Sequence, residues 1–337
     1  MRRRITVFGG SGFIGRHLVK RLAAAGSEIR IAVRDIESAQ FLKPAGDIGQ
    51  IVLWQTDIND PEQVKTAVAG ADAVINLVGT LIDSGGNSYA GIHIDGAKNI
   101  AAAARAGGVR QMVHISAIGA DKFGASNYAR TKALGEKAVQ TEFPTVTILR
   151  PGIVFGPEDN FFNRFAGLTR ILPFLPVFGC PLIPKITFGN ENGLTIRVDL
   201  YGEGGSRFQP VYVGDVADAI VASLASPLTA GQVYELGGPT VYSYKQLMEL
   251  VLRYTGRQKW LAPTPYAFAT IGAFFLQLLP KPMMTCDQVT LLKSDNVVTD
   301  GHQTLASLGI DPIAAEVILP TYLSRFRTAG VRHLQES

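Results

Sequence analysis

Two groups of residues in this sequence have types and spacings that could do chemistry. The first is the series Gly9, Gly12 and Gly15, which follows a short apolar run and precedes an amphipathic one. Glycines let a ligand approach backbone N–H groups without a Cβ in the way, and a helix N-terminus adds free donors and the positive end of a dipole. This arrangement suits a pyrophosphate, so we expect a dinucleotide to bind here. The residues expected to contact it are Gly9, Ser11, Gly12, Phe13, Ile14 and Gly15.

The second group is Tyr128 and Lys132, whose four-residue spacing on a predicted helix puts both side chains on one face. An ammonium group beside the phenol would lower the pKa of Tyr128 and make it a general acid or base near neutral pH. Lys132 would also hold a nicotinamide ribose. Ser116 ends the preceding predicted strand, where its hydroxyl could orient a carbonyl. Tyr and Lys at this spacing also occur on helices without any catalytic role, and it is the order of the three residues that favours chemistry.

The elements that would position these residues alternate between strand and helix. Apolar strands are predicted at residues 5–8, 27–35, 50–57, 71–79, 111–120 and 145–152, and helices at 16–26, 61–70, 96–107 and 128–143. Short apolar strands that alternate with helices predict a parallel sheet covered on both faces and wound by right-handed crossovers. The predicted fold class is therefore α/β, a Rossmann-type doubly wound parallel sheet with a smaller C-terminal α/β portion.

The end of the second predicted strand bears on which dinucleotide binds. NAD sites usually place an acid there for the ribose 2′-OH, whereas a 2′-phosphate favours a guanidinium. Arg34 at this position favours NADPH (NADP) over NAD, although Asp35 could still be the ribose acid and Arg34 a solvated charge. Strand ends supply the remaining position-based contacts. Asp57 and Ile58 close the third strand, where an adenine would lie, and Leu77, Val78 and Gly79 close the fourth.

Composition narrows the class of protein. The 337 residues suffice for one large or two modest domains, and 47% hydrophobic against 18% charged residues suggests surface that is buried against a partner. The net charge of +4 comes without a basic patch interleaved with aromatics, so we expect no nucleic-acid partner. We expect no metal, because no ligand spacing is present. Two isolated cysteines indicate a reducing compartment, and the basic start runs straight into the first strand without a signal-peptide core.

The second half of the chain lacks the regular alternation. We predict an NAD(P)-binding domain over residues 1–156 and a smaller substrate-side or partner-binding portion over 157–337. Within the latter, 211–213 and 232–238 are expected to extend the main sheet. An insertion at about 180–203 indicates a β-hairpin around the residues GNENG, for which we expect a partner contact.

One stretch of this half, Tyr266 to Leu279, is apolar nearly all round. At about 1.5 Å per residue it spans only about 21 Å, too short for a bilayer crossing. Arg257 and Lys259 before it and Lys281 after it are typical flanks of a segment at a membrane interface or against a membrane subunit. A buried core helix is the alternative. Residues 161–178 are a second candidate of the same kind.

The motifs also resemble a known superfamily. The glycine series, Ser116, Tyr128, Lys132 and the run RPGIVFGPED at 150–159 are similar to the short-chain dehydrogenase/reductase superfamily, in its extended or atypical branch. This resemblance implies that Pro151 and Ile153 also contact the cofactor. The runs at 9–26, 127–166 and 208–220 more closely resemble the nucleotide-binding accessory subunits of respiratory complex I, the alpha subcomplex subunit nine family, in a bacterial form.

That closer resemblance implies a subunit that holds NADPH in a structural or regulatory role without turnover of its own. It would be peripheral, on the cytoplasmic side of a bacterial inner membrane, among other complex I subunits near the quinone site. Extended members often carry a second hydroxyl beside the serine, and Ala117 in its place weakens carbonyl orientation. Two alternatives remain. One is a free NADP-dependent reductase, epimerase or dehydratase that acts on a sugar nucleotide or lipid-like carbonyl through Tyr128, Lys132 and Ser116. The other is a redox sensor that binds NADP(H) and a partner without catalysis.

Overall fold

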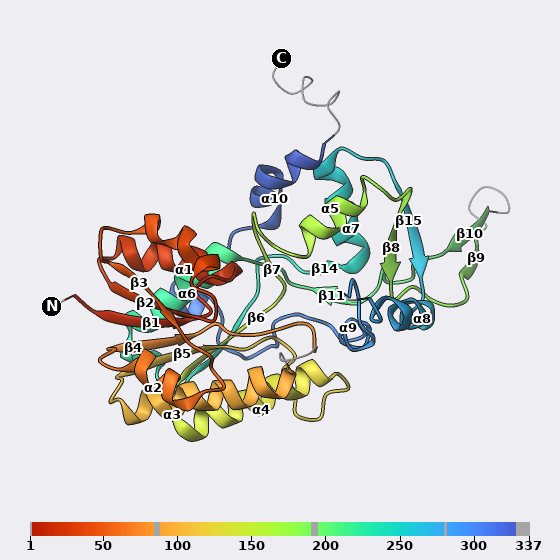
Figure 1. Cartoon of the computed structure of the whole chain (residues 1–337). Helices are drawn as coiled ribbons and strands as arrows, with labels where there is room; N and C mark the ends of the chain where they lie inside the picture. Colours follow the sequence, from red (N-terminus) through yellow and green to blue (C-terminus); the bar gives the residue numbers. More distant parts are fainter. Residues whose placement is uncertain (1, 84–87, 190–194, 280–281, 328–337) are drawn as a thin grey trace, which may run out of the picture. The chain divides into compact units, whose positions relative to one another are not determined.

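A parallel seven-stranded sheet organises the first half of the protein, as a computed structural model describing residues 2–83, 88–189, 195–279 and 282–327 shows (Figure 1). Its strands lie in the spatial order β13 (Val233–Leu236), β6 (Thr147–Pro151), β5 (Gln111–Ile115), β4 (Ala73–Asn76), β1 (Arg4–Phe8), β2 (Glu28–Val33) and β3 (Ile51–Gln55). The chain reverses its direction of travel across the sheet between β1 and β4, where Rossmann folds bind ligands. The predicted fold class and its six strands are confirmed.

Helices cover both faces of this sheet, as the alternation of apolar side chains requires (Figure 1). The helices are α1 (Phe13–Ala24), α2 (Pro61–Val68), α3 (Ala97–Ala106), α4 (Asn127–Glu142) and α6 (Val213–Ala225). Ile5 and Val7 of β1 point into one core with α1 and α6, whereas Phe8 points into the other with α2, α3 and α4. Other local segments are the 3₁₀ turns Glu37–Ala45, Pro227–Thr229 and Ala306–Leu308 and the π-helical Ala90–Gly96.

Two compact units make up the chain, and neither is continuous in sequence. The first consists of Met1–Val154, Val211–Gly237 and Val298–Pro312, and the second consists of Phe155–Pro210, Gly238–Val297 and Ile313–Ser337. The expected extension of the sheet by 232–238 is confirmed as β13. The expected extension by 211–213 is wrong, because β12 (Val211–Tyr212) is only two residues long and α6 begins directly after it.

The second unit is built from short elements. They are β7 (Val154–Phe155, at the boundary), α5 (Phe162–Leu168), β8 (Phe174–Phe178), β9 (Lys185–Gly189), β10 (Thr195–Asp199), β11 (Arg207–Phe208), β14 (Tyr242–Ser243), α7 (Tyr244–Thr255), β15 (Trp260–Thr264), α8 (Tyr266–Leu276), α9 (Cys286–Leu291), α10 (Ala315–Leu323) and the 3₁₀ turn Ser324–Phe326. Tyr244 is 2% exposed and meets the rings of Phe161, Phe165 and Phe178. These aromatic contacts form the centre of this unit.

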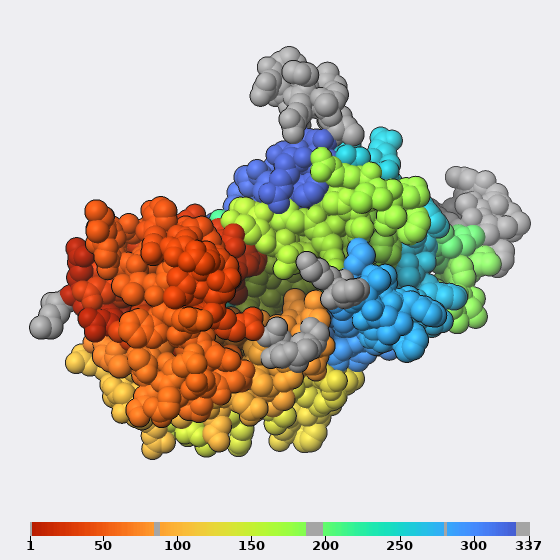
Figure 2. Space-filling view, viewed as in Figure 1, coloured from red at the N-terminus to blue at the C-terminus, as the bar shows by residue number. Residues whose placement is uncertain are grey.

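Two sequence predictions for this unit meet different outcomes. β9 and β10 pair antiparallel, which confirms the predicted hairpin, and its turn at 190–194 lies outside the described residues. Residues 161–178 divide between core and surface: Phe162, Phe165, Leu175 and Val177 are buried, whereas Ile171 is 82% exposed, so a partner contact of this segment stays a prediction. The atoms of α8, in contrast, lie at the molecular surface, in blue (Figure 2).

Candidate functional site

The glycine turn between β1 and α1 is shaped by glycines with different tasks. Gly9 adopts a φ of +76°, which favours glycine. A Cβ on Gly15 would lie 2.4 Å from the carbonyl oxygen of Gly10, so Gly15 lets α1 pack on the turn. Among the described atoms, a Cβ on Gly12 would meet only the Gly9 oxygen, at 3.2 Å, and no described side chain caps α1. The first N–H groups of α1 are therefore not capped by a side chain, and the space beside Gly12 is open. The other predicted contacts here occupy the turn and the start of α1: Ser11, Phe13 and Ile14.

The end of β4 lies against both the glycine turn and α4. A Cβ on Gly9 would come within 3.2 Å of the carbonyl carbon of Leu77 and the nitrogen of Val78. Two residues further, a Cβ on Gly79 would lie 3.3 Å from Nζ of Lys132. The structure thus brings these predicted residues into one continuous row from the glycine turn to the lysine.

Lys132 is buried beneath the end of β5. Its Nζ donates a hydrogen bond to the carbonyl oxygen of Ile115 at 3.2 Å. Burial lowers the pKa of Lys132 to about 8, against the opposing effect of the Glu136 charge. Ser116 follows Ile115 and is 3% exposed, and its Oγ has no hydrogen-bond partner among the described residues. A buried hydroxyl in this state is ready to bond a ligand atom beside the lysine.

Tyr128 packs in an aromatic cluster at the start of α4. Its ring meets the ring of His93 edge-on, with centroids 5.5 Å apart, and that of Tyr89 at 6.0 Å. Burial raises the pKa of Tyr128 to about 12, whereas the sequence spacing predicts that the lysine lowers it. That prediction is wrong because Lys132 bonds the Ile115 carbonyl and is itself buried, while the aromatic rings around the phenol disfavour its charged form. At neutral pH the phenol is protonated and acts as a donor.

His93 is a residue of this site that sequence reasoning missed. The backbone N–H of Thr80 donates to its Nε2 at 3.1 Å, so the proton of the neutral ring sits on Nδ1, 3.0 Å from Oγ1 of Thr131. The ring also stacks on Tyr89, with centroids 5.4 Å apart. His93 therefore ties the segment after β4 to the helix that carries Tyr128. The sequence could not indicate this role, because His93 stands alone in an apolar run and forms no recognisable motif with another polar residue.

A second missed histidine, His114 of β5, lies beside the same strand end. Nδ2 of Asn76 donates to its Nδ1 at 3.1 Å. Burial, with repulsion by Lys132 as the second cause, lowers the pKa of both His93 and His114 to about 3. In the unfolded chain each ring has its ordinary pKa of 6.5. Between pH 6.5 and 3 the unfolded state therefore binds more protons, and the folded state loses stability as the pH falls.

This pH dependence can be measured directly. We expect the free energy of unfolding to fall by up to about 1.4 kcal/mol per pH unit for each of the two rings as the pH drops below 6.5. His93→Phe keeps a ring against Tyr89 and should remove the contribution of one ring. Urea denaturation of both proteins at several pH values between about 7 and 4.5 gives the two slopes. Equal slopes would contradict a neutral, buried His93.

Arg34 and Asp35 follow β2 at the carboxyl edge of the sheet. Oδ1 of Asp35 accepts the backbone N–H groups of Glu37 at 3.0 Å and Ser38 at 3.3 Å. This carboxylate oxygen therefore caps the N-terminus of the 3₁₀ turn that follows. Arg34 is exposed at the end of the strand. Which of the two side chains meets a ribose substituent stays a prediction.

Four further predicted contacts lie at the ends of β3 and β6. Oδ1 of Asp57 accepts the backbone N–H of Asn59 at 2.9 Å, and Ile58 is buried in the core with α2 and α3. The backbone oxygens of Pro151 and Ile153 accept N–H groups from neighbouring segments at 3.0 and 2.9 Å. All four lie at the same edge of the sheet as the glycine turn, and their role toward a nucleotide stays a prediction.

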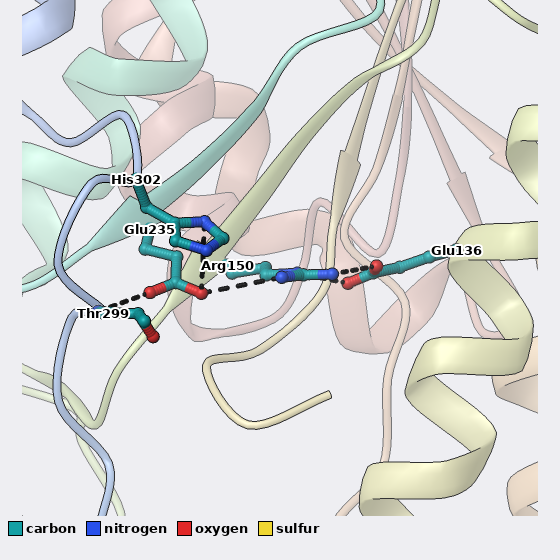
Figure 3. Close-up of polar contacts among 5 residues, drawn as sticks. All are labelled: Glu136, Arg150, Glu235, Thr299 and His302. Carbon is teal, nitrogen blue, oxygen red and sulfur yellow. Dashed lines mark hydrogen bonds and ion pairs between the residues drawn. The ribbon is translucent and has the colours of Figure 1, made fainter. Parts of the chain in front are cut away.

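A charged network holds the middle of α4 to the sheet (Figure 3). Arg150 of β6 donates to both carboxylate oxygens of Glu136 on α4, at 2.9 and 2.7 Å. Its Nη1 lies 3.5 Å from Oε1 of Glu235 on β13. Glu235 also accepts the backbone N–H of Thr299 at 2.8 Å and lies 3.8 Å from Nδ1 of His302. One guanidinium therefore neutralises two buried carboxylates and fixes the helix that carries the Tyr–Lys pair.

Comparison with known proteins identifies the family of this chain. A family model described as NAD(P)H-binding matches residues 9–160. The mitochondrial NADH dehydrogenase [ubiquinone] 1 alpha subcomplex subunit 9 of Arabidopsis thaliana is 32% identical, over 96% of this chain and 78% of its own length. The chain belongs to the alpha subcomplex subunit 9 family. The subunit 9 of Rattus norvegicus is 30% identical over 96% of this chain and 80% of its own length.

Two further similarities are more limited. A ceramide reductase of Caulobacter vibrioides is 31% identical over 51% of this chain and 53% of its own length. The solved UDP-glucose 4-epimerase of Thermus thermophilus, in complex with NAD, superposes with a TM-score of 0.63 at 21% identity, over 97% of this chain and 99% of the epimerase. At that identity the epimerase supports the fold alone.

Proposed function

We propose that this chain is a peripheral accessory subunit of a proton-pumping NADH:quinone oxidoreductase, respiratory complex I, and that it holds NADPH without turnover of its own. Its place would be the cytoplasmic side of a bacterial inner membrane, among the complex I subunits near the quinone site. The observation that carries this proposal is the similarity to subunit 9 proteins along 96% of the chain, which includes the glycine turn and the Tyr–Lys helix.

The residues at the carboxyl edge of the sheet fit a nicotinamide dinucleotide. The open position at Gly12 and the uncapped start of α1 suit its pyrophosphate. The ammonium of Lys132 and the unpartnered Oγ of Ser116 suit the hydroxyls and the carboxamide at its other end. When bound, such a nucleotide would supply hydride-transfer chemistry. The chain's own residues would bind and orient it.

The state of Tyr128 supports retention of the nucleotide over turnover. With a pKa of about 12, the phenol donates a hydrogen bond at neutral pH and is a poor base. Ala117 beside Ser116 supplies no second hydroxyl to hold a substrate carbonyl. Binding without catalysis is the role that these groups serve best.

Co-purification tests this proposal. We would extract native membranes with a mild detergent, separate the complexes under native conditions and identify co-migrating chains by mass spectrometry. Co-migration with quinone-reductase subunits in a fixed ratio, with NADPH retained, is the expected result. Migration as a small species without those subunits would refute the accessory role.

Arg34 provides a test of the nucleotide's identity. If its guanidinium binds a 2′-phosphate, Arg34→Ala removes charge-assisted hydrogen bonds worth about 1.5–3 kcal/mol, so the Kd for NADPH should rise about tenfold or more. The Kd for NADH, which lacks the phosphate, should change little. Titration calorimetry of both nucleotides, with Asp35→Ala as the neighbouring control, checks this. An equal loss for both nucleotides would refute the assignment.

A free NADP-dependent reductase, epimerase or dehydratase is the second candidate. The observation that favours it is the unsatisfied Ser116 hydroxyl at the end of β5, with Tyr128 and Lys132 on one helix nearby in sequence. Steady NADPH oxidation with a lipid-like or sugar carbonyl, abolished by Tyr128→Phe, would establish a reductase. An epimerase or dehydratase regenerates its nucleotide, so it would be established by formation of a new sugar-nucleotide product, again abolished by Tyr128→Phe. The absence of both signals across such a panel would leave the accessory role.

A further inference from the structure

Helix α8 and the turn that follows it present one wide apolar face to solvent. Phe268, Ile271, Phe275 and Leu278 follow one another at spacings of three or four residues, and each is 58–71% exposed. The opposite side of the helix carries small side chains, Ala269 and Ala273, which are buried. A face of this kind in water is unfavourable by about 25 cal/mol for each Å² of apolar surface, so another surface must cover it. This observation also excludes the alternative of a buried core helix.

The chemistry of the face indicates what that surface is. The three side chains of the segment that carry polar groups are engaged within the unit. The Tyr266 hydroxyl donates to the Leu292 carbonyl at 2.6 Å, Thr270 donates to the Tyr266 carbonyl at 2.8 Å, and Gln277 accepts the Cys286 N–H at 3.4 Å. The face thus offers a partner only apolar side chains. Protein interfaces carry about one hydrogen bond per 100–200 Å², whereas the interior of a bilayer requires none. A lipid surface fits this face better than another subunit does.

Charge and length agree with lipid. No charged residue occurs in the sequence between Lys259 and Lys281, and both of these flanks are cationic; Lys281 lies outside the described residues. Cations beside an apolar segment are attracted to anionic headgroups. The 11 residues of α8 extend only about 16 Å, and none of the described helices is long and apolar enough to cross a membrane. The helix can therefore lie along a bilayer but not through it.

A second exposed apolar pair occurs in the same unit. The hydroxyl of Tyr266, the first residue of α8, lies 2.7 Å from where a Cβ on Gly179 would be. Three and four residues beyond Gly179, before the β9–β10 hairpin, Leu182 and Ile183 are 66% and 81% exposed. The unit therefore exposes apolar side chains on a second segment besides α8.

We infer that α8 is an interfacial membrane anchor, which lies in the plane of the bilayer with Phe268, Ile271, Phe275 and Leu278 inserted among the acyl chains. This inference rests on the proposed function for the presence of a membrane partner, and it names the surface that makes the contact.

Flotation of the purified full chain with vesicles tests the anchor. The wild-type chain should float with vesicles of phosphatidylcholine and phosphatidylglycerol, and less with phosphatidylcholine alone. Phe268→Ser and Phe275→Ser should each lower the partition coefficient about tenfold. Phe123→Ser is the matched control, since Phe123 is 83% exposed and belongs to the other compact unit, and it should float like the wild type. Thermal unfolding of each variant verifies that it is folded.

The outcomes separate this inference from the proposed function. Loss of flotation in the α8 variants supports the anchor, even if the chain never co-migrates with complex I subunits, in which case the accessory role alone fails. A folded wild-type chain that stays in the aqueous phase overturns the anchor. So do α8 variants that float unchanged. If those variants instead lose co-migration with complex I while the wild type does not float, the face binds a protein subunit and only the accessory role stands.

Discussion

Gly12→Val should abolish tight nucleotide binding and leave the protein folded. The valine side chain would occupy the approach to the N-terminus of α1, where the pyrophosphate is proposed to accept backbone hydrogen bonds. The loss of two or three such charge-assisted bonds costs about 4 kcal/mol, which is about a thousandfold in Kd. Within the protein, the new Cβ meets only the Gly9 oxygen at 3.2 Å among the described atoms, so the strain is small. Calorimetric titration and thermal unfolding of the same preparation measure both effects.

Gly15→Ala is the contrasting variant in the same turn. Its Cβ would lie 2.4 Å from the Gly10 carbonyl oxygen, and backbone atoms cannot yield as a flexible side chain does. We expect Gly15→Ala to lower the melting temperature clearly, whereas Gly12→Val lowers it little. A Gly12→Val protein that retains wild-type affinity for NADPH would show that the nucleotide does not bind at this turn. In membranes, the same variant reveals whether incorporation into a complex depends on the nucleotide.

Arg150→Met should destabilise the first unit by about 3–5 kcal/mol, because it leaves two buried carboxylates without their cation. The side chains of Glu136 and Glu235 are 7% and 4% exposed, so water replaces little of the lost interaction. Methionine keeps much of the volume of the arginine stem, so the effect is mainly electrostatic. Urea denaturation at neutral pH gives the free energy of unfolding for this variant and for the wild type.

Arg4→Met is the matched control on the same sheet. Arg4 pairs with Glu28 at 3.3 Å, but their side chains are 45% and 42% exposed, and such pairs contribute less than about 1 kcal/mol. A small effect at Arg4 beside a large one at Arg150 would show that burial of the carboxylates is decisive. Equal small effects at both positions would refute the role given to the network.

Local sequence patterns were enough to predict the scaffold of the site. Apolar runs bounded by turn residues indicated the strands, and the glycine series located the turn before α1, because both depend on neighbours in sequence. The hairpin of β9 and β10 was predictable for the same reason. The sequence did not show which of the apolar residues in 161–178 are buried and which are exposed, because apolar residues follow the same pattern in both places. Only the packing of Phe162 and Phe165 around Tyr244 distinguishes the two cases.

The electrostatics of the site could not be predicted from sequence. The direction of the Tyr128 pKa depends on burial and on the Lys132 hydrogen bond to Ile115, which joins α4 to β5 across the fold. His93 is held in the site by a hydrogen bond from the backbone N–H of Thr80, in the segment after β4. Every residue except proline has such an N–H group, so the sequence does not indicate which one will donate. Arg150 and Glu235 become neighbours only when β13 pairs with β6. Such partners are set by strand order and register.

The discontinuity of the first unit has a consequence for synthesis on the ribosome. A nascent chain that ends near residue 156 already contains every residue proposed to touch the nucleotide. It lacks α6, which covers one face of the sheet with α1, and β13, which closes its edge beside β6. It also lacks Thr299, whose backbone N–H bonds Glu235. Until α6 and β13 have been translated, the emerging sheet therefore exposes an apolar face that chaperones would recognise.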